Sequence, residues 1–236
     1  MATFVQTNVG LYFGGYSLAS SFNAIALNLG NSPQDDTVYG DTFVSNAAGL
    51  SSVSFEGEGY WESATDSVLQ SSLGSDDTVL SVTPVDQAAG SPSLFSKVTT
   101  STYNPISTGT VGSMMGFSLS AEGRGEKNVS GEILVIPATY TSSSETVTNA
   151  SIGAVSATQK IYSALHVTAA SGTLDVIVES SPNSGWGSES TRITHTQFTA
   201  VGAEMLSTAG AITDAYWRVK WTISGSFDFI VSLGII

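Results

Sequence analysis

Apolar and polar positions alternate in short runs along this chain, and turn-forming residues separate the runs. A period of two places neighbouring side chains on opposite faces, which is the pattern of a half-buried β-strand. The clearest run is residues 49–61, GLSSVSFEGEGYW. In it Val53, Phe55 and two glycines alternate with two serines followed by Glu56 and Glu58. We expect this segment to form a strand with one apolar face and one acidic face.

The same pattern predicts further strands in both halves of the chain. In the first half they cover residues 4–8, 12–13, 22–29, 78–84, 94–102, 112–123 and 132–136. In the second half they cover residues 160–168, 174–180, 191–198, 216–224 and 226–235, with a turn at 170–173. The ending SAEGRG of residues 112–125 echoes SFEGEG in the acidic strand, which indicates two adjacent strands. Short strands between frequent turn signals are typical of an all-β sandwich.

One segment, residues 63–74, has a helical pattern instead. The apolar residues at helical spacing are Val68, Leu69 and Leu73. Thr65 or Asp66 is expected to cap the N-terminus, and Gly74 suits the C-terminus. The fold class is therefore mainly β with one short helix.

Two segments lack a clear period. Residues 30–48 form a long polar connection, which is either a flexible surface loop or a functional contact. The stretch after Pro137 is rich in serine and threonine, as linkers are. We therefore predict a first domain over residues 1–136, a linker over 137–148 and a second β-sandwich domain over 149–236.

Composition and charge narrow the range of functions. The 236 residues include 41% hydrophobic residues and no cysteine, so a core can form and disulfides and thiolate metal sites are excluded. The net charge is −13, opposite to that of a typical nucleic-acid binder. Residues 1–135 carry thirteen acidic and three basic side chains. No signal peptide and no membrane-spanning run are visible, so assembly in a cytoplasm is expected.

Candidate catalytic groups are few. His166 and His195 are the two histidines, and there is no G-x-S-x-G sequence. Both histidines are interpreted as ordinary surface or strand residues. Glu56 and Glu58 have the spacing of a carboxylate pair, but a solvated strand face explains them better. We expect no enzymatic activity, no cofactor and no catalytic residue.

Candidate binding residues are equally sparse. Asp35 with Asp36, and Asp76 with Asp77, do not follow the calcium-loop spacing, so solvated turns are expected and no metal site. Trp186 stands in a glycine-rich and serine-rich loop. It is interpreted as an anchor that folds back on the sandwich, with an exposed sugar-binding aromatic as the alternative.

Residues 10–136 resemble the major tail tube proteins of long-tailed bacteriophages. The resemblance rests on the order of GLYFGGYSLA, FNAIALNL, DDTVYGD, GLSSVSFEGEGYWE, a short capped helix, SMMGFSLSAEGRG and GEILVI. It implies a tail-tube β-sandwich or barrel whose subunits add edge to edge into rings. In that family the rings usually have six subunits and stack into a tube, and the lumen is acidic.

The resemblance also implies roles for particular residues. Glu56 and Glu58 become candidate lumen residues. Asp35, Asp36, Tyr39 and Asp41 lie in the connection that resembles the loop by which tail tube subunits reach an adjacent ring. DNA is implied only in transit and without sequence specificity. The other implied partners are further copies of the chain and the tail terminator, tape measure and distal tail proteins of the virion.

The second half resembles carboxy-terminal β-sandwich modules, jelly-roll or immunoglobulin-like, that are attached to phage virion proteins. Such a module is expected to decorate the outer surface of the tube. Alternatively it is a second, diverged tube domain, and three chains then make a pseudo-hexameric ring. A capsid decoration protein or a receptor-binding or glycan-binding virion protein is the alternative function.

Overall fold

The computed structural model describes residues 8–40, 42–108, 110–146 and 152–236. Within these residues the chain is mainly β with one short helix, as predicted. Two compact units are present, and each is described by itself. The sheet unit comprises Ser21–Asp77 and Lys97–Asn128, and the sandwich unit comprises the described parts of Met1–Ser20, Thr78–Ser96 and Val129–Ile236.

The division of the chain differs from the predicted boundary near Pro137. This proline lies inside strand β10 (Val129–Tyr140), which pairs with β15 (Tyr216–Ile235). The pairing shifts register between Val135 and Ala138, and such a bulge accommodates a residue that has no N–H to donate. The predicted linker 137–148 therefore starts within a strand, and its residues 147 and 148 lie outside the described residues.

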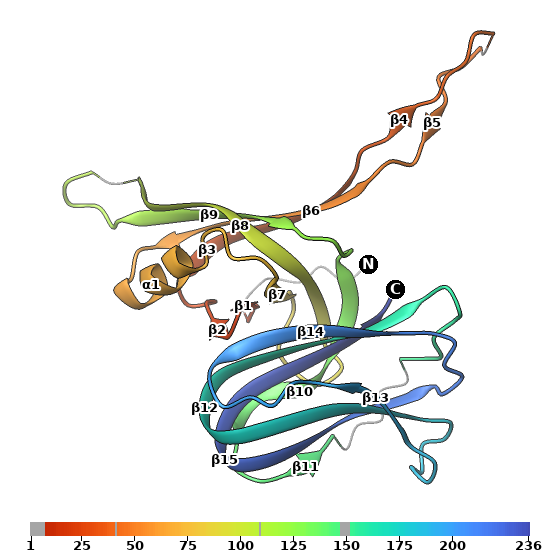
Figure 1. Cartoon of the computed structure of the whole chain (residues 1–236). Coiled ribbons are helices and arrows are strands. Elements are labelled where there is room, and N and C mark those ends of the chain that lie inside the picture. The colour runs from red at the N-terminus through yellow and green to blue at the C-terminus, as the bar shows by residue number, and fades with distance from the viewer. Residues whose placement is uncertain (1–7, 41, 109, 147–151) are drawn as a thin grey trace. The chain divides into compact units, whose positions relative to one another are not determined.

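The sandwich unit is built around two long strands, β12 (Lys160–Ser181) and β15, which pair antiparallel over almost their whole length. On its other side, β15 pairs with β10. The first half of β12 pairs on its other side with β14, and its last part pairs with β13 (Figure 1). The remaining strands are β1 (Gly10–Phe13), β2 (Tyr16–Ser17), β7 (Thr78–Thr83), the start of β8 (Pro92–Thr108), β11 (Ser144–Glu145), β13 (Ser190–Thr194) and β14 (Gly202–Ala209).

The turn predicted at residues 170–173 is wrong, because these residues continue β12. Gly172 and Gly225 face each other across the β12–β15 pair, and both have positive φ, 107° and 112°. A Cβ at Gly172 would meet the carbonyl oxygen of Ser224, and one at Gly225 would meet that of Ser171. The glycine pair lets two strands remain paired through a conformation that other residues rarely adopt.

One hydrophobic core collects residues from both halves of these long strands. Leu165 and Val167 precede Gly172, Val176 and Val178 follow it, and all four are buried in the same cluster as Trp217. The opposite face of the first half of β12 is buried as well. There, Tyr162 and Ala164 pack with residues of β7, β8, β10 and β14, namely Val79, Phe95, Val129 and Met205.

The sheet unit is a four-stranded antiparallel sheet in the order β3 (Phe22–Asn31), β6 (Ser51–Tyr60), β9 (Gly116–Gly123) and the later part of β8. The predicted adjacency of the two echoing strands, β6 and β9, is confirmed. One face packs against α1 (Ser63–Ser71). Its buried side chains are Val53, Phe55, Leu69, Val98, Phe117, Leu119 and Ala121.

The helix begins earlier than the predicted caps. Glu62 is the N-cap residue and makes no side-chain cap bond. Thr65 and Asp66 have other tasks: the Thr65 hydroxyl lies 2.7 Å from that of Ser21, and Asp66 accepts a 2.6 Å hydrogen bond from the Tyr103 hydroxyl. These contacts fasten the helix to the sheet. Gly74 follows the helix with φ of 70°, in line with its predicted place at the C-terminal end.

The connection predicted at residues 30–48 is a β-hairpin arm, which we call the long arm (residues 30–50). It continues β3 and β6 beyond the sheet, and β4 (Gln34–Asp35) pairs with β5 (Asn46–Ala47) within it (Figure 1). The amide of Ser32 donates to Leu50 at 3.0 Å, and that of Asp36 donates to Ser45 at 3.1 Å. The sequence does not predict these paired strands, because neither side of the described arm is buried and no apolar alternation marks them.

Candidate functional site

The outer face of the sheet unit, opposite α1, carries the predicted acidic residues. Glu56 and Glu58 are both exposed, and they point away from the buried residues Phe55 and Gly57. Across the strands, Glu56 is paired with Ala26 and Ser120, and Glu58 is paired with Ala24 and Ser118. Small neighbours on both sides leave the two carboxylates unobstructed.

A third carboxylate, that of Glu122, belongs to the same face. It lies across from Ser54 on β6 and Thr99 on β8, and it is exposed. Sequence reasoning did not select Glu122 as a site residue. The signal was present, because Glu122 occupies in SAEGRG the place that Glu56 has in SFEGEG.

Apart from Tyr60, a large exposed side chain at the end of β6, the residues around the three glutamates are small or polar. Those paired around the three glutamates are Ala24, Ala26, Ser54, Thr99, Ser118 and Ser120. Lys97 is the one basic residue in the sequence of the four strands. A surface with this composition offers little apolar area to a protein partner, and its negative potential repels polyanions.

The β3 edge of this sheet is open. In the described part of the chain β3 pairs with β6 alone, so one side of its ten residues presents unpaired backbone groups. Edge strands of stable monomers are commonly protected by lysine, proline or bulges. The sequence FNAIALNLGN has neither lysine nor proline, and its one irregularity lies near its start, between Phe22 and Ala24. This edge is therefore a template for pairing with another strand.

The predicted contact residues lie on the long arm. Thr37 donates a backbone hydrogen bond of 2.9 Å to Asp35, and hydrogen bonding by Thr37, from its side chain and then its backbone, lowers the pKa of Asp35. Asp36 and Tyr39 are exposed, Tyr39 completely. Asp41 lies outside the described residues. The arm also exposes Leu29 at its base and Val38, Phe43, Val44 and Leu50.

Both histidines are buried, so the surface alternative in their interpretation is wrong, whereas His166 lies in strand β12, in line with the strand alternative. His166 is 1% exposed, because the second face of β12 is covered within the sandwich unit. Its Nδ1 lies 2.5 Å from the carbonyl oxygen of Gly14, and its Nε2 lies 2.7 Å from the Ser81 hydroxyl. Burial lowers the pKa of His166 to about 4. The ring is thus neutral, with Nδ1 donating and Nε2 accepting.

His195 belongs to a serine–histidine–glutamate arrangement. Its Nε2 is 3.0 Å from the Ser163 hydroxyl, and its Nδ1 is 2.9 Å from a carboxylate oxygen of Glu204. These distances resemble a hydrolase triad. However, Ser163 is completely buried on β12, where no substrate carbonyl can approach its hydroxyl. Glu204 also accepts hydrogen bonds from the backbone and side chain of Thr196, which indicates a role in holding strands together.

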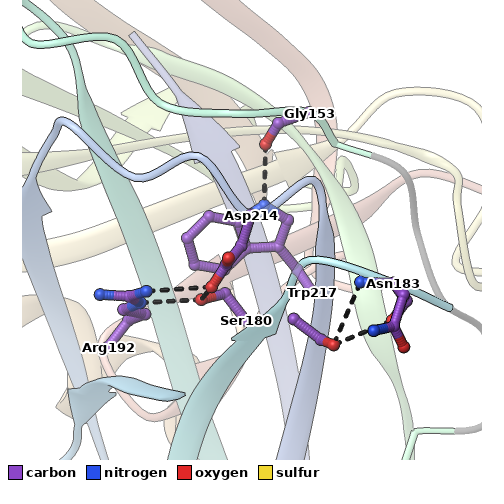
Figure 2. Close-up of polar contacts among 7 residues, drawn as sticks. Gly153, Ser180, Asn183, Arg192, Asp214 and Trp217 are labelled. Carbon is purple, nitrogen blue, oxygen red and sulfur yellow. Dashed lines mark hydrogen bonds and ion pairs between the residues drawn. The ribbon is translucent and has the colours of Figure 1, made fainter. Parts of the chain in front are cut away.

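A second polar cluster joins β12, β13 and the segment before β15. Arg192 donates to Asp214 at 2.9 Å and to Ser180 at 2.7 Å, and Ser180 donates to Asp214 at 2.7 Å (Figure 2). The Ser180 hydrogen bond, and then Arg192, lower the pKa of Asp214. Figure 2 also shows the indole nitrogen of Trp217 donating to Gly153. These contacts link neighbouring elements of the sandwich unit, which indicates a structural role for the cluster.

Trp186 lies over the guanidinium of Arg218, 4.4 Å from it. Arg218 in turn contacts Glu179 at 2.7 Å and Glu145 at 3.0 Å. This geometry agrees with Trp186 as a loop anchor, since cation–π stacking occupies one face of its ring. Asp76 and Asp77 pair with Arg124, as an ordinary charged turn would.

No group of three or more histidine, aspartate or glutamate residues able to hold a metal ion occurs among the described residues. Likewise, the helix that the structure describes is too short to cross a membrane. The candidate site is therefore the outer face of the sheet unit together with its open edge and its arms.

No protein-family model and no curated protein sequence matches the chain. Among solved structures it is similar to a chain of the virion of a native gene transfer agent particle. The TM-score is 0.40 and the identity is 13%, over 49% of this chain and 92% of that one.

Two further solved structures are similar over nearly the whole chain. One is the SPP1 Dit protein, described as a paradigm of the hub adsorption apparatus in phages that infect Gram-positive bacteria. It has a TM-score of 0.37 and 7% identity, over 98% of this chain and 100% of that one. The other belongs to the phage p2 baseplate in its activated conformation, with a TM-score of 0.41 and 8% identity, over 97% and 98%.

Proposed function

We propose that this chain is a structural component of a phage-type tail, in which copies join side by side into rings and rings stack into a tube. The observation that carries the proposal is the outer face of the sheet unit. This face is acidic, its other residues are mostly small, and an open strand edge borders it. In a ring this face would line a channel through which DNA passes without adsorbing. Glu56, Glu58 and Glu122 are the proposed lumen residues.

The strand directions in the sheet unit support closure into a ring. β3 runs toward the long arm. The neighbouring pairs β3–β6, β6–β9 and β9–β8 are all antiparallel, so β8 runs away from the end of the sheet that carries the long arm. Rotation about an axis along the strands therefore brings β3 of one copy antiparallel to β8 of the next. Thr100 on β8 already forms an isolated bridge with Leu73, so the pairing would use the β8 edge beyond Thr100. Antiparallel pairing of these two edges would convert six open sheets into one closed barrel. Closure satisfies the backbone groups that the β3 edge leaves unpaired.

The number of copies follows from the number of such sheets. The described residues of each chain contain one four-stranded sheet of this kind, in the sheet unit, and the sandwich unit has a different topology. This supports a ring of six over a ring of three with two tube domains per chain. The sandwich unit is proposed as the outward decoration, and the long arm, with Asp35, Asp36, Tyr39 and Asp41, as the contact to an adjacent ring.

The proposal also carries the partners implied by the sequence resemblance. The assembled protein is placed in the virion tail, with the tail terminator, tape measure and distal tail proteins at its ends. Capsid decoration or glycan binding remains the alternative function. The stacking of Trp186 on Arg218 does not favour glycan binding, because it occupies an aromatic face that a sugar would use.

Electron cryo-microscopy of the purified full-length chain, over a range of protein concentrations, tests the proposal. We expect hollow rings or tubes with a continuous β-barrel wall and with Glu56 and Glu58 facing the lumen. A protein that remains monomeric at every concentration would contradict the proposal. So would rings in which both carboxylates face outward. A Glu56→Gln/Glu58→Gln variant serves as the control, because it should assemble normally if the two residues line the channel and make no contact.

A further inference from the structure

The sheet unit has a second hairpin, whose exposed apolar residues the proposed function does not use. This short arm (residues 106–115) connects β8 to β9. Its described turn is held by two hydrogen bonds, from the amide of Ser113 to the carbonyl of Thr110 and from the amide of Thr110 to the hydroxyl of Ser113, both 2.9 Å. Gly112 has φ of 93°, as a tight turn of this kind requires. Val111 stands at the apex and is completely exposed.

The exposed apolar residues of the short arm form one group. Besides Val111, they are Ile106, Met114 and Met115. The carbonyl of Met115 accepts a 2.9 Å hydrogen bond from the amide of Trp61, so the base of the arm is fixed to the sheet. Large exposed apolar groups on an ordered turn indicate an interaction surface.

The two arms leave opposite ends of one sheet. Ser54, near the start of β6, lies across from Glu122, whereas Tyr60, at its end, lies across from Gly116. The long arm therefore extends from the Ser51 end and the short arm from the Tyr60 end, as Figure 1 shows. Each copy thus presents, in each direction along the strands, one arm that exposes apolar side chains.

We propose that the long arm of one copy packs alongside the short arm of a copy in the next ring. The inference rests on the proposed function. The tip of the long arm, with Tyr39 and Phe43, would cover Met114 and Met115, while Val111 would lie against the paired strands β4 and β5 in the middle of the long arm. The partner is a second copy of this chain, because every copy supplies both halves of the contact. Because the two arms leave opposite ends of the sheet, this head-to-tail contact repeats along the direction of the strands instead of closing into a ring.

The size of the contact also favours repeated copies over an isolated pair. Each arm offers only a few large apolar side chains, and neither has a lysine or arginine to add charge pairs. One such contact is small compared with a stable interface. Six such contacts made together between two rings bind much more tightly than one contact, because each contact holds the others in place. The stacking is therefore expected to depend steeply on ring formation.

Cysteine cross-linking tests this inference, because the chain has no cysteine of its own. A Phe43→Cys variant and a Met114→Cys variant, one with a tag that changes its gel mobility, are mixed under assembly conditions. They are then treated with a short bis-maleimide. We expect the mixed dimer to form, and neither variant to cross-link to itself. Ser188→Cys, on an exposed loop of the sandwich unit, replaces either partner as the control and should give no cross-link.

The outcomes separate this inference from the proposed function. Self-cross-linking of Phe43→Cys would overturn the inference, because it would show two long arms in contact. Stacked rings without the mixed cross-link would overturn it as well, and would leave the proposed function intact. Absence of rings would overturn the proposed function itself.

A second variant uses a different measurement. Val111→Ser/Met114→Ser should shorten the stacks at least about tenfold while single rings persist, because the contact is multivalent. Ile136→Ser changes an exposed apolar residue on β10, outside both arms, and should leave stack length unchanged. Stacks of unaltered length in the double variant would refute the contact.

Discussion

At the scale of single residues, the buried groups that sequence patterns assigned to the surface are the most informative. His166 lies between the apolar residues Leu165 and Val167 on β12. This alternation indicates that the face of the strand with His166 is polar and exposed. The strand is buried on both faces, and the pattern of alternation cannot show this. Only the hydrogen bonds to Ser81 and Gly14, from segments far away in the sequence, make a buried neutral imidazole tolerable.

His166 gives the protein an acid-sensitive stability. Its pKa is about 4 in the folded chain and about 6.5 in the unfolded chain, so unfolding takes up a proton between these values. The contribution is fully present above pH 6.5 and is lost as the pH falls through this window. At pH 4 the loss amounts to about 3 kcal/mol of unfolding free energy. Urea unfolding at pH 7 and pH 4 measures it.

The control for this prediction is a His166→Gln variant, which has no titrating ring. It should be less stable than the natural protein at pH 7, and its free energy of unfolding should vary less between the two pH values. An identical pH dependence in both proteins would show that other groups cause the acid sensitivity.

At the scale of elements, the sequence predicted most strands but not their continuity. The residues of β3, β6, β7 and β9 were located by alternation alone. β12 and β15 were each divided, because Gly172 and Gly225 resemble turn glycines when read one at a time. Their meaning depends on facing each other across two strands, which is a property of pairing. The long arm was missed for a related reason: its ladder buries nothing, so no apolar period marks it.

The glycine pair should be intolerant of side chains. Gly172→Ala and Gly225→Ala each place a Cβ against a carbonyl oxygen of the facing strand, at a positive φ. We expect each substitution to cost about 2–4 kcal/mol of unfolding free energy, from strain and overpacking together. Thermal unfolding of the purified variants measures the cost.

Gly187→Ala is the matched control for that measurement. No atom lies within 4 Å of a Cβ built at Gly187, and its φ is not positive. Its stability should change by less than about 0.5 kcal/mol. Equal stabilities for all three variants would mean that the paired strands tolerate a side chain at Gly172 and Gly225.

At the scale of the whole molecule, the three glutamates of the outer face could be predicted only in part. Sequence reasoning found Glu56 and Glu58 because both lie on one strand. It missed Glu122, which joins them only through the pairing of β6 with β9. The excess of acidic over basic residues was visible in the sequence of the first half of the chain, although the sequence could not show that the three glutamates share one surface.

Charge reversal on this face should convert a repelling wall into a binding one. A Glu56→Lys/Glu58→Lys/Glu122→Lys variant is expected to retain double-stranded DNA in the lumen of assembled rings at 0.15 M salt. Retention should fall steeply as salt rises, because phosphate contacts release counterions. Electron cryo-microscopy of rings mixed with DNA shows where the density lies.

The matching glutamine variant removes the same negative charges without adding positive ones, and it should bind no DNA. If DNA attached to the outside of rings made from the lysine variant, the three positions would not be lumenal.

The long arm has one more consequence, which concerns proteases. The first lysine or arginine of the chain is Lys97, so residues 1–96 contain no site for trypsin. Protruding hairpins are ordinarily the first segments to be cleaved. Here the most protruding segment is inert to enzymes that require a basic residue, whereas Tyr39 and Phe43 expose it to those that cut after aromatic residues. The long arm therefore stays intact among trypsin-like enzymes even where nothing covers it.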